Sequence, residues 1–193
     1  MAHSFDPRFV PLSIAVLTVS DTRTFDTDTS GQTLVDALQH AGHQLADRRL
    51  VIDDVYHLRA VVSQWIVDPQ VQVILLTGGT GFTVRDNTPQ AIAPLFDRTM
   101  DGFGELFRSL SLADIGTSTI QSRALAGFAN GTLICCLPGS PGACRLAWDQ
   151  ILLEQLDSRT RPCNAVPHLK KRPREPGAAT GCGGDQCACG SRG

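Results

Sequence analysis

Residues 71–89 have the sequence VQVILLTGGTGFTVRDNTP, and this stretch is the most informative about the fold of the chain. The near-continuous apolar run from Val71 to Leu76 is typical of a strand buried on both faces. A glycine-rich turn, TGGTG at 77–81, follows at once and allows the backbone to turn tightly and approach a ligand closely. Asp86 comes next, and then Thr88-Pro89 predicts the N-cap and first residue of a helix. This succession is how α/β proteins hold anions and metal-bound phosphates.

The turn differs from the common phosphate loops. A Walker loop needs Lys-Ser/Thr after its last glycine, whereas Phe82-Thr83 follow Gly81 here. A dinucleotide fingerprint needs a third glycine at position 84, which is Val84. Taken alone, the turn is equally consistent with a plain connection between a strand and a helix, so the rest of the chain has to decide.

Strands and helices alternate along the chain. Further strands are predicted at 12–19, 44–52 and 132–137, and the second of these is less apolar, which places it nearer a sheet edge. Helical spacing of apolar residues predicts helices beginning at Ser30 and Pro141 and over 58–66, 91–96 and 103–110. The alternation predicts a single α/β domain with a mostly parallel sheet and helices on both faces.

Length and composition fit one domain with tails. The chain has 193 residues and a formal net charge of −2, which gives no electrostatic reason to expect a nucleic acid or an anionic membrane as partner. No apolar run is long enough to span a membrane and the first ten residues lack a signal segment, so we expect a cytoplasmic protein. We predict a leader at 1–11, a domain at 12–171 and a disordered Gly/Cys-rich tail at 172–193. The tail contains three cysteines, Cys182, Cys187 and Cys189. A structural zinc site normally needs four ligands, so we assign these cysteines no role.

Polar clusters follow every predicted strand. In a parallel sheet the carboxyl ends of the strands lie at one edge, where ligands bind, so we expect four loops to meet at one crevice. The residues predicted to contact a ligand there are Ser20, Asp21, Thr77, Gly78, Gly79, Thr80, Gly81, Pro138, Gly139, Ser140 and Pro141.

Two carboxylates at neighbouring strand ends suggest phosphate chemistry. Asp53 and Asp86 suit Mg²⁺ bound with a nucleotide, because magnesium usually takes one or two protein carboxylates and completes its shell with water and phosphate oxygens. Phosphoryl or nucleotidyl transfer then needs positioning and charge neutralisation more than covalent help. The alternative is that each acid merely precedes a helix. Asp54 ranks second, since adjacent residues point in different directions.

Several motifs together resemble one family. They are LTVSDTR (17–23), DTSG (28–31), TGGTG (77–81) with Asp86, GFGELFR (102–108), GTSTIQSRALAG (116–127), PGSPGAC (138–144) and LDSRTRPCN (156–164). This combination, which covers roughly residues 10–171, is similar to the molybdenum cofactor biosynthesis protein B (MoaB) family. That family is related to the molybdopterin adenylyltransferases of the MogA and gephyrin G-domain type.

The resemblance implies a three-layer α/β/α domain that forms a homo-oligomer, either a trimer or a hexamer. It implies binding of molybdopterin and Mg-ATP, with AMP transferred to the pterin's terminal phosphate and pyrophosphate released. The adenylylated product would pass to molybdate insertion, which makes the molybdate-insertion protein an expected partner. Asp53 and Asp86 map onto the aspartates associated with activity, and Ser118 and Ser122 fall in a ligand-binding segment.

One position departs from the family pattern. The usual proline before the first aspartate is Ile52 here, and loss of that rigid residue is expected to affect the position of Asp53. Because some members of the branch do not catalyse adenylylation, the alternative function is a non-catalytic molybdopterin carrier or scaffold.

The segment GFGELFRSL at 102–110 is apolar enough to suggest a subunit interface. Phe103 and Phe107 are the candidates, and the alternative for at least one of them is packing within its own chain.

Overall fold

The computed structural model describes residues 8–171. Its strands are β1 (Ser13–Val19), β2 (Gln44–Val51), β3 (Val73–Thr77), β4 (Arg98–Thr99), β5 (Leu125–Ala129) and β6 (Thr132–Leu137). Its α-helices are α1 (Thr29–His40), α2 (Val55–Val67), α3 (Thr88–Ile92), α4 (Asp101–Ile115), α5 (Pro141–Ala147) and α6 (Leu153–Gln155). Shorter helical turns are η1 (Ala93–Leu95), η2 (Gly116–Gln121), η3 (Trp148–Leu152) and η4 (Val166–His168).

The strands form one mostly parallel, six-stranded sheet in the order β2-β1-β3-β6-β5-β4. The pairs β1–β2, β1–β3 and β3–β6 are parallel, so the predicted strands lie side by side with their carboxyl ends at one edge. The prediction that the 44–52 strand lies near an edge is confirmed, since β2 is the terminal strand.

The antiparallel end of the sheet is absent from the sequence prediction. The strand β5 pairs antiparallel with β6, and β4 pairs antiparallel with β5. A two-residue loop, Asn130-Gly131, joins β5 to β6, and both residues have positive φ (48° and 70°). An Asn-Gly pair between two apolar runs is the usual signal of such a tight hairpin, so the sequence did contain a sign of this strand.

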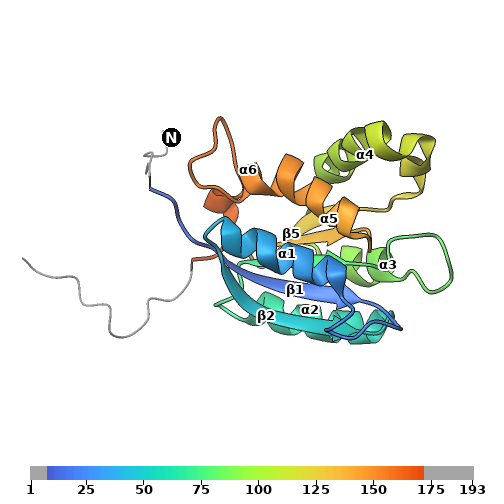
Figure 1. The fold of residues 1–193 in the computed structure, drawn as a ribbon. Helices are drawn as coiled ribbons and strands as arrows, with labels where there is room; N and C mark the ends of the chain where they lie inside the picture. Colours follow the sequence, from blue (N-terminus) through green and yellow to red (C-terminus); the bar gives the residue numbers. More distant parts are fainter. Residues whose placement is uncertain (1–7, 172–193) are drawn as a thin grey trace, which may run out of the picture.

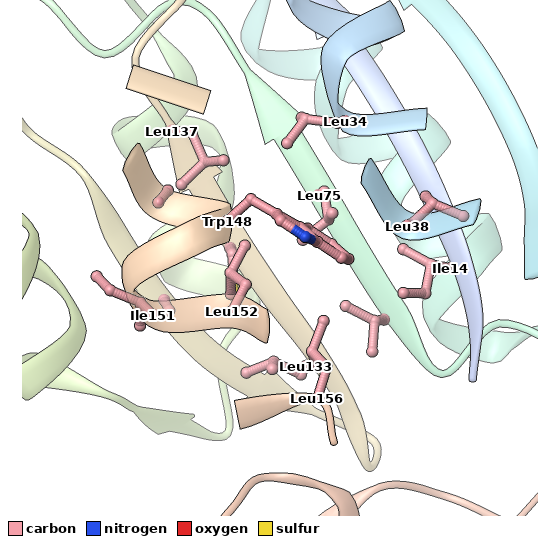
Figure 2. Packing of buried hydrophobic residues seen from close by; sticks show 14 of the residues in the cluster. Ile14, Leu34, Leu38, Leu75, Leu133, Leu137, Trp148, Ile151, Leu152 and Leu156 are labelled. Atoms are coloured by element: carbon pink, nitrogen blue, oxygen red, sulfur yellow. The ribbon is translucent and has the colours of Figure 1, made fainter. Parts of the chain in front are cut away.

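Helices cover both faces of the sheet, as predicted (Figure 1). One core cluster joins α1, α4 and the α5–α6 region to one face, and the other joins α2 and α3 to the opposite face. The side chains of β1 divide between the two: Ile14 belongs to the first cluster and Leu17 to the second. Figure 2 shows Trp148 in the first cluster, close to Leu34 and Leu75.

The two phenylalanines in the apolar segment of α4 are buried by their own chain. Phe103 is 4% exposed and Phe107 is 2% exposed, and both belong to the first core cluster. The prediction that these two side chains lie in a subunit interface is therefore wrong. The helix turns both rings inward because they are four residues apart, on one face.

Part of the predicted leader contacts the domain. The amide of Val10 donates to Ser158 Oγ at 3.0 Å, and the Phe9 ring lies 5.2 Å from the His43 ring. The predicted domain limits stay predictions. The 172–193 tail and its cysteines lie outside the described residues.

Within residues 8–171, no helix has the length and apolar character needed to cross a membrane.

Candidate functional site

A cavity of about 560 Å³ opens at the carboxyl ends of β3 and β6. Most of the predicted contact residues line it, namely Gly78, Gly79, Thr80, Gly81, Asp86, Ser118, Ser122, Pro138, Gly139 and Ser140. The other predicted residues, Ser20, Asp21, Asp53, Thr77 and Pro141, are not among its wall residues. Four of them, Asp21, Asp53, Thr77 and Pro141, instead contact or shape segments that form the wall or lie beside it, as described below, whereas Ser20 bonds to Arg23 in its own loop.

The glycine turn is compact because its neighbours leave no space for side chains. Gly78 has φ +107°, and a Cβ there would lie 2.3 Å from the Val19 carbonyl oxygen. Gly79 has φ +65°, and a Cβ there would lie 2.4 Å from both Asp53 Oδ2 and Thr88 Oγ1. Both positions therefore require glycine for conformation and for space.

Thr88 supports this turn and does not cap α3. The residue at the N-cap of α3 is Asn87, and its side chain makes no capping hydrogen bond. The Thr88 hydroxyl donates instead to the Gly78 carbonyl at 2.8 Å. The predicted N-cap at Thr88 is therefore wrong by one residue, because the hydroxyl satisfies a carbonyl of the glycine turn.

The turn after β6 lies against the glycine turn. A Cβ at Gly139 would be 3.2 Å from the Gly78 Cα, which measures how closely the two turns approach. Ser140 caps α5 by accepting from the Ala143 amide at 3.2 Å, and Pro141 is the first residue of that helix, as predicted. The buried Thr77 hydroxyl donates to the Pro138 carbonyl at 3.0 Å. Thr77 and Pro141 thus shape this turn from outside the cavity.

Asp86 lies in the cavity wall with its carboxylate turned toward the glycine turn. Its Oδ2 accepts from the Thr83 amide at 2.8 Å and from the Thr83 hydroxyl at 2.6 Å, and it would lie 2.8 Å from a Cβ at Gly81. Burial acts to raise the pKa of Asp86, but the hydrogen bonds from Thr83 outweigh it and lower the pKa below its usual value. Asp86 is therefore ionised at neutral pH.

Asp53 lies beside Gly79 and is only 6% exposed. Its Oδ1 accepts from the Asn87 amide at 3.0 Å, and its own amide donates to Asp21 Oδ1 at 3.0 Å. Burial raises the pKa of Asp53, and the negative charges of Asp86 and Asp21 raise it further. The hydrogen bonds from Asn87 act to lower the pKa but do not outweigh these effects. These hydrogen bonds hold Asp53 in place although Ile52 precedes it.

Three polar residues near Asp53 have structural partners. Asp21 makes a two-point ion pair with Arg85, with N–O distances of 2.6 and 2.9 Å, and this pair lowers the Asp21 pKa. Ser20 Oγ accepts from the Arg23 amide at 3.1 Å. Asp54 caps α2 by accepting from the Tyr56 and His57 amides at 3.0 and 2.9 Å, in keeping with its lower rank.

The other wall of the cavity comes from α4 and η2. From this region the sequence predicted only Ser118 and Ser122 as site residues. Its unpredicted members are Phe107, Ser111, Asp114, Ile115 and Gln121. The first four are separated by steps of four, three and one residues, so they follow one side of a helix. Helical spacing that mixes apolar and polar residues is the signal that the sequence offered for this wall, although it does not by itself distinguish a cavity wall from the core.

The candidates for holding a metal at this site are a pair of acids. Within residues 8–171, no group of three or more His, Cys, Asp or Glu side chains lies close enough to hold a metal ion. Asp53 and Asp86, on either side of the glycine turn, offer carboxylate oxygens, which Mg²⁺ prefers. A two-carboxylate set fits a magnesium ion that takes its remaining ligands from water and phosphate.

Comparison with known proteins agrees with this architecture. The family model described as a probable molybdopterin binding domain matches residues 15–158. Molybdenum cofactor biosynthesis protein B of Escherichia coli (strain K12) is 57% identical over 163 residues, which cover 84% of this chain and 96% of that protein.

Solved structures show the same fold. A crystal structure of a molybdenum cofactor biosynthesis protein B has a TM-score of 0.74 and 41% identity, covering 78% of this chain and 93% of that one. A structure of MogA has a TM-score of 0.65 and 28% identity, covering 75% of this chain and 99% of that one. The chain belongs to the MoaB family of molybdenum cofactor biosynthesis proteins.

Proposed function

We propose that this protein adenylylates molybdopterin with Mg-ATP. The observation that carries the proposal is the placement of Asp53 and Asp86 on two sides of a glycine turn whose main chain lines a 560 Å³ cavity. Such a turn suits phosphate groups, because the backbone can approach them without interference from side chains. A cavity of this size lies within the usual range for a small-molecule site.

The cavity has two chemically different walls, which suits a ligand with a ring and a phosphate. The turns after β3 and β6 present backbone groups and small residues, the side suited to phosphates. The α4 and η2 side presents Phe107 and Ile115 together with polar side chains such as Ser122, which suits a heteroaromatic ring system.

The reaction proposed is a nucleotidyl transfer. An oxygen of the pterin phosphate attacks the α-phosphorus of ATP, the bond between the α-phosphorus and the bridging oxygen breaks, and pyrophosphate leaves with the bonding electrons. The protein's part is to align the two phosphates and to stabilise the redistributed charge. No covalent intermediate with the protein is required.

Asp53 and Asp86 would hold the magnesium ion that accompanies ATP. When bound, Mg²⁺ neutralises charge on the phosphate oxygens. The ionised state of Asp86, which follows from its lowered pKa, suits it for this role. Asp53 has a raised pKa, so its readiness to bind a cation depends more strongly on pH.

The alternative function is a molybdopterin carrier or scaffold that keeps the cavity without the chemistry. The replacement of the family's proline by Ile52 is the feature that raises this alternative. Against it, Asp53 is fixed by Asp21 and Asn87 through hydrogen bonds that need no proline.

Assembly, partners and location form part of the same proposal. We infer a homo-oligomer, either a trimer or a hexamer, and delivery of the adenylylated pterin to a molybdate-insertion protein. We also infer a cytoplasmic location. Cys135, Cys136, Cys144 and Cys163 are free thiols in the described part of the chain, a state that reducing compartments maintain.

The deciding experiment is to incubate the full chain with molybdopterin and Mg-ATP and to quantify the AMP–pterin conjugate and pyrophosphate. We expect them in equal amounts, and no conjugate with an ATP analogue whose α,β-bridging oxygen is replaced by methylene. Stoichiometric pterin binding without conjugate formation would overturn the enzyme proposal and favour the carrier.

A further inference from the structure

Arg123 contacts three carbonyl groups, two in the glycine turn and one at Asp86. It lies just before β5, is half-buried, and comes from the antiparallel side of the sheet. Its Nε donates to the Thr80 carbonyl at 3.3 Å, and its Nη2 donates to the Asp86 carbonyl at 2.7 Å and also to that of Gly81. Its own amide donates to the Thr80 carbonyl at 3.3 Å.

These three acceptors span the segment that carries Asp86. Carbonyl oxygens that converge on one point repel one another unless a donor group satisfies them together, and a guanidinium has several donors in a fixed planar arrangement. Phe82, in the same segment, lies with its ring centre 5.0 Å from the Arg123 guanidinium carbon. The ring and the carbonyls thus enclose the guanidinium on the turn's side.

The remaining contacts of this segment are mostly local. Asp86 is tied to Thr83, and the side chains of Phe82, Thr83 and Val84 are exposed. Arg85 adds the exposed ion pair to Asp21, and exposed pairs contribute little. Arg123 therefore provides the multipoint link between the Asp86 segment and the α4–η2–β5 side of the cavity.

We propose that Arg123 is a positioning residue that sets the location of Asp86 by binding the carbonyls of Thr80, Gly81 and Asp86. This inference rests on the proposed function, because it assigns Arg123 a role in AMP transfer through Asp86. The positive charge of Arg123 also favours the ionised form of that carboxylate. Binding of ligand to Arg123 itself is not part of the proposal, since Nε and Nη2 of its guanidinium already donate to the carbonyls of residues 80, 81 and 86.

The test compares Arg123→Lys with a matched control, Arg59→Lys. Lysine keeps the charge but loses the planar fork, so it cannot satisfy three carbonyls in the same geometry. Arg59 also donates from its guanidinium to backbone carbonyls, those of Ala91 and Gln90 at 3.1 and 3.0 Å, away from the turn. A general loss of guanidinium–carbonyl bonds would affect both variants.

For Arg123→Lys we expect the single-turnover rate of AMP transfer at saturating ligands to fall by about 10- to 100-fold, the scale of a small misplacement of reacting groups. We expect pterin affinity to change by less than about threefold, within what a lost peripheral contact costs. Amides of residues 80–87 should exchange hydrogen faster than in the wild-type chain. Arg59→Lys should show neither change.

A double-variant cycle separates positioning from direct binding. If Arg123 acts through Asp86, adding Arg123→Lys to Asp86→Asn should lower the rate little further, because the two residues form one unit. Fully additive losses, or a selective loss of pterin affinity with unchanged hydrogen exchange, would overturn the proposal. Should Arg123→Lys fail to fold, Arg123→Ala supplemented with guanidinium ion serves instead, and recovery of the protected amides is the expected result.

Failure of this inference is distinguishable from failure of the proposed function. If the wild-type chain binds pterin and forms no AMP–pterin conjugate, the adenylylation proposal fails. The hydrogen-exchange comparison still decides whether Arg123 holds the turn, and unchanged exchange in Arg123→Lys would then overturn the inference.

Discussion

The two halves of the sheet contribute to the cavity in different ways. The parallel half, with β1, β2, β3 and β6, supplies tight turns and the two carboxylates at its strand ends. The antiparallel end, with β5 and β4, is associated with α4, η2 and Arg123, which contribute side chains. Under the proposed function, the chemistry of the phosphates is thus concentrated in one half, and recognition of the ring and support of the turn in the other. This difference can be tested residue by residue.

The largest effect is expected at the carboxylates of the parallel half. Asp86→Asn keeps the side-chain size and removes the charge, so the AMP-transfer rate should fall by roughly 10²-fold or more, the cost of losing one electrostatic contact in a transition state. Asp53→Asn should behave similarly. Single-turnover measurement of AMP transfer, with pterin affinity measured in parallel, checks both variants.

Asp54→Asn is the matched control for these two variants. Asp54 caps α2, and asparagine is also a good N-cap, so turnover should change little. Near-normal turnover in Asp86→Asn would remove the functional distinction between the two halves of the sheet.

A second expected effect concerns pH. Since burial raises the pKa of Asp53 in the free protein, the AMP-transfer rate measured with Mg-ATP well below saturation should fall about tenfold per pH unit below that pKa, and this acid limb should lie above the usual range of an aspartate. The stability effect has the opposite sign. The pKa of Asp53 is higher in the folded chain than in the unfolded chain. As pH rises between these two pKa values, Asp53 loses its proton in the unfolded chain first. Its contribution therefore lowers the free energy of unfolding over that pH range.

A pH–rate profile of Asp53→Asn tests this assignment. The limb due to Asp53 should disappear, while Asp54→Asn should retain it. A limb that persists unchanged in Asp53→Asn would assign the titration to another group.

A smaller effect is expected on the α4–η2 side. Ser122 lines the cavity, and Ser122→Ala removes one hydroxyl, so pterin affinity should weaken by up to about tenfold, as for loss of one hydrogen bond. The rate at saturating pterin should stay within a factor of about three, because in the proposed reaction this wall does not carry the reacting phosphates. Titration with molybdopterin and single-turnover kinetics separate the two quantities. A rate loss as large as that of Asp86→Asn would contradict the division between the walls.

The smallest effect on function is expected at the hairpin of the antiparallel end. Asn130 has φ +48°, which alanine adopts only at a cost, so Asn130→Ala should lower the free energy of unfolding by about 1–2 kcal/mol. AMP transfer by the folded variant should be unchanged. Asn130→Gly tolerates the same φ and serves as the control, and chemical denaturation measures both. An unchanged denaturation curve for Asn130→Ala would show that this φ is not costly.

The sequence predicted the parallel half well because its signals are local. Buried strands appear as apolar runs, and the turns after them appear as glycine, proline and acidic residues, as at Gly78 and Pro138. The strand β5 of the antiparallel end was missed because it contains a glycine, Gly127, which weakens a strand pattern. The hairpin signal at Asn130-Gly131 was nevertheless present.

The wall on α4 could not be predicted with the same ease. Phe107 and Ser111 are both buried and lie on one side of the helix, so their spacing indicates burial without distinguishing core from cavity. The hydrogen bonds of Arg123 join residues that are 37 to 43 positions apart in the sequence. They form only because the fold brings these two segments together. Only the three-dimensional structure reveals such a link.

The different origins of the two walls have a consequence for evolution. At Gly78 and Gly79 any side chain would collide with Val19, Asp53 or Thr88, so that side of the cavity has almost no freedom to accept mutations. Asp114 and Ile115, by contrast, are exposed side chains of the wall on α4, where a different side chain meets no such collision. A descendant of this protein could therefore acquire a different ring specificity by substitutions on α4 while inheriting the phosphate side intact.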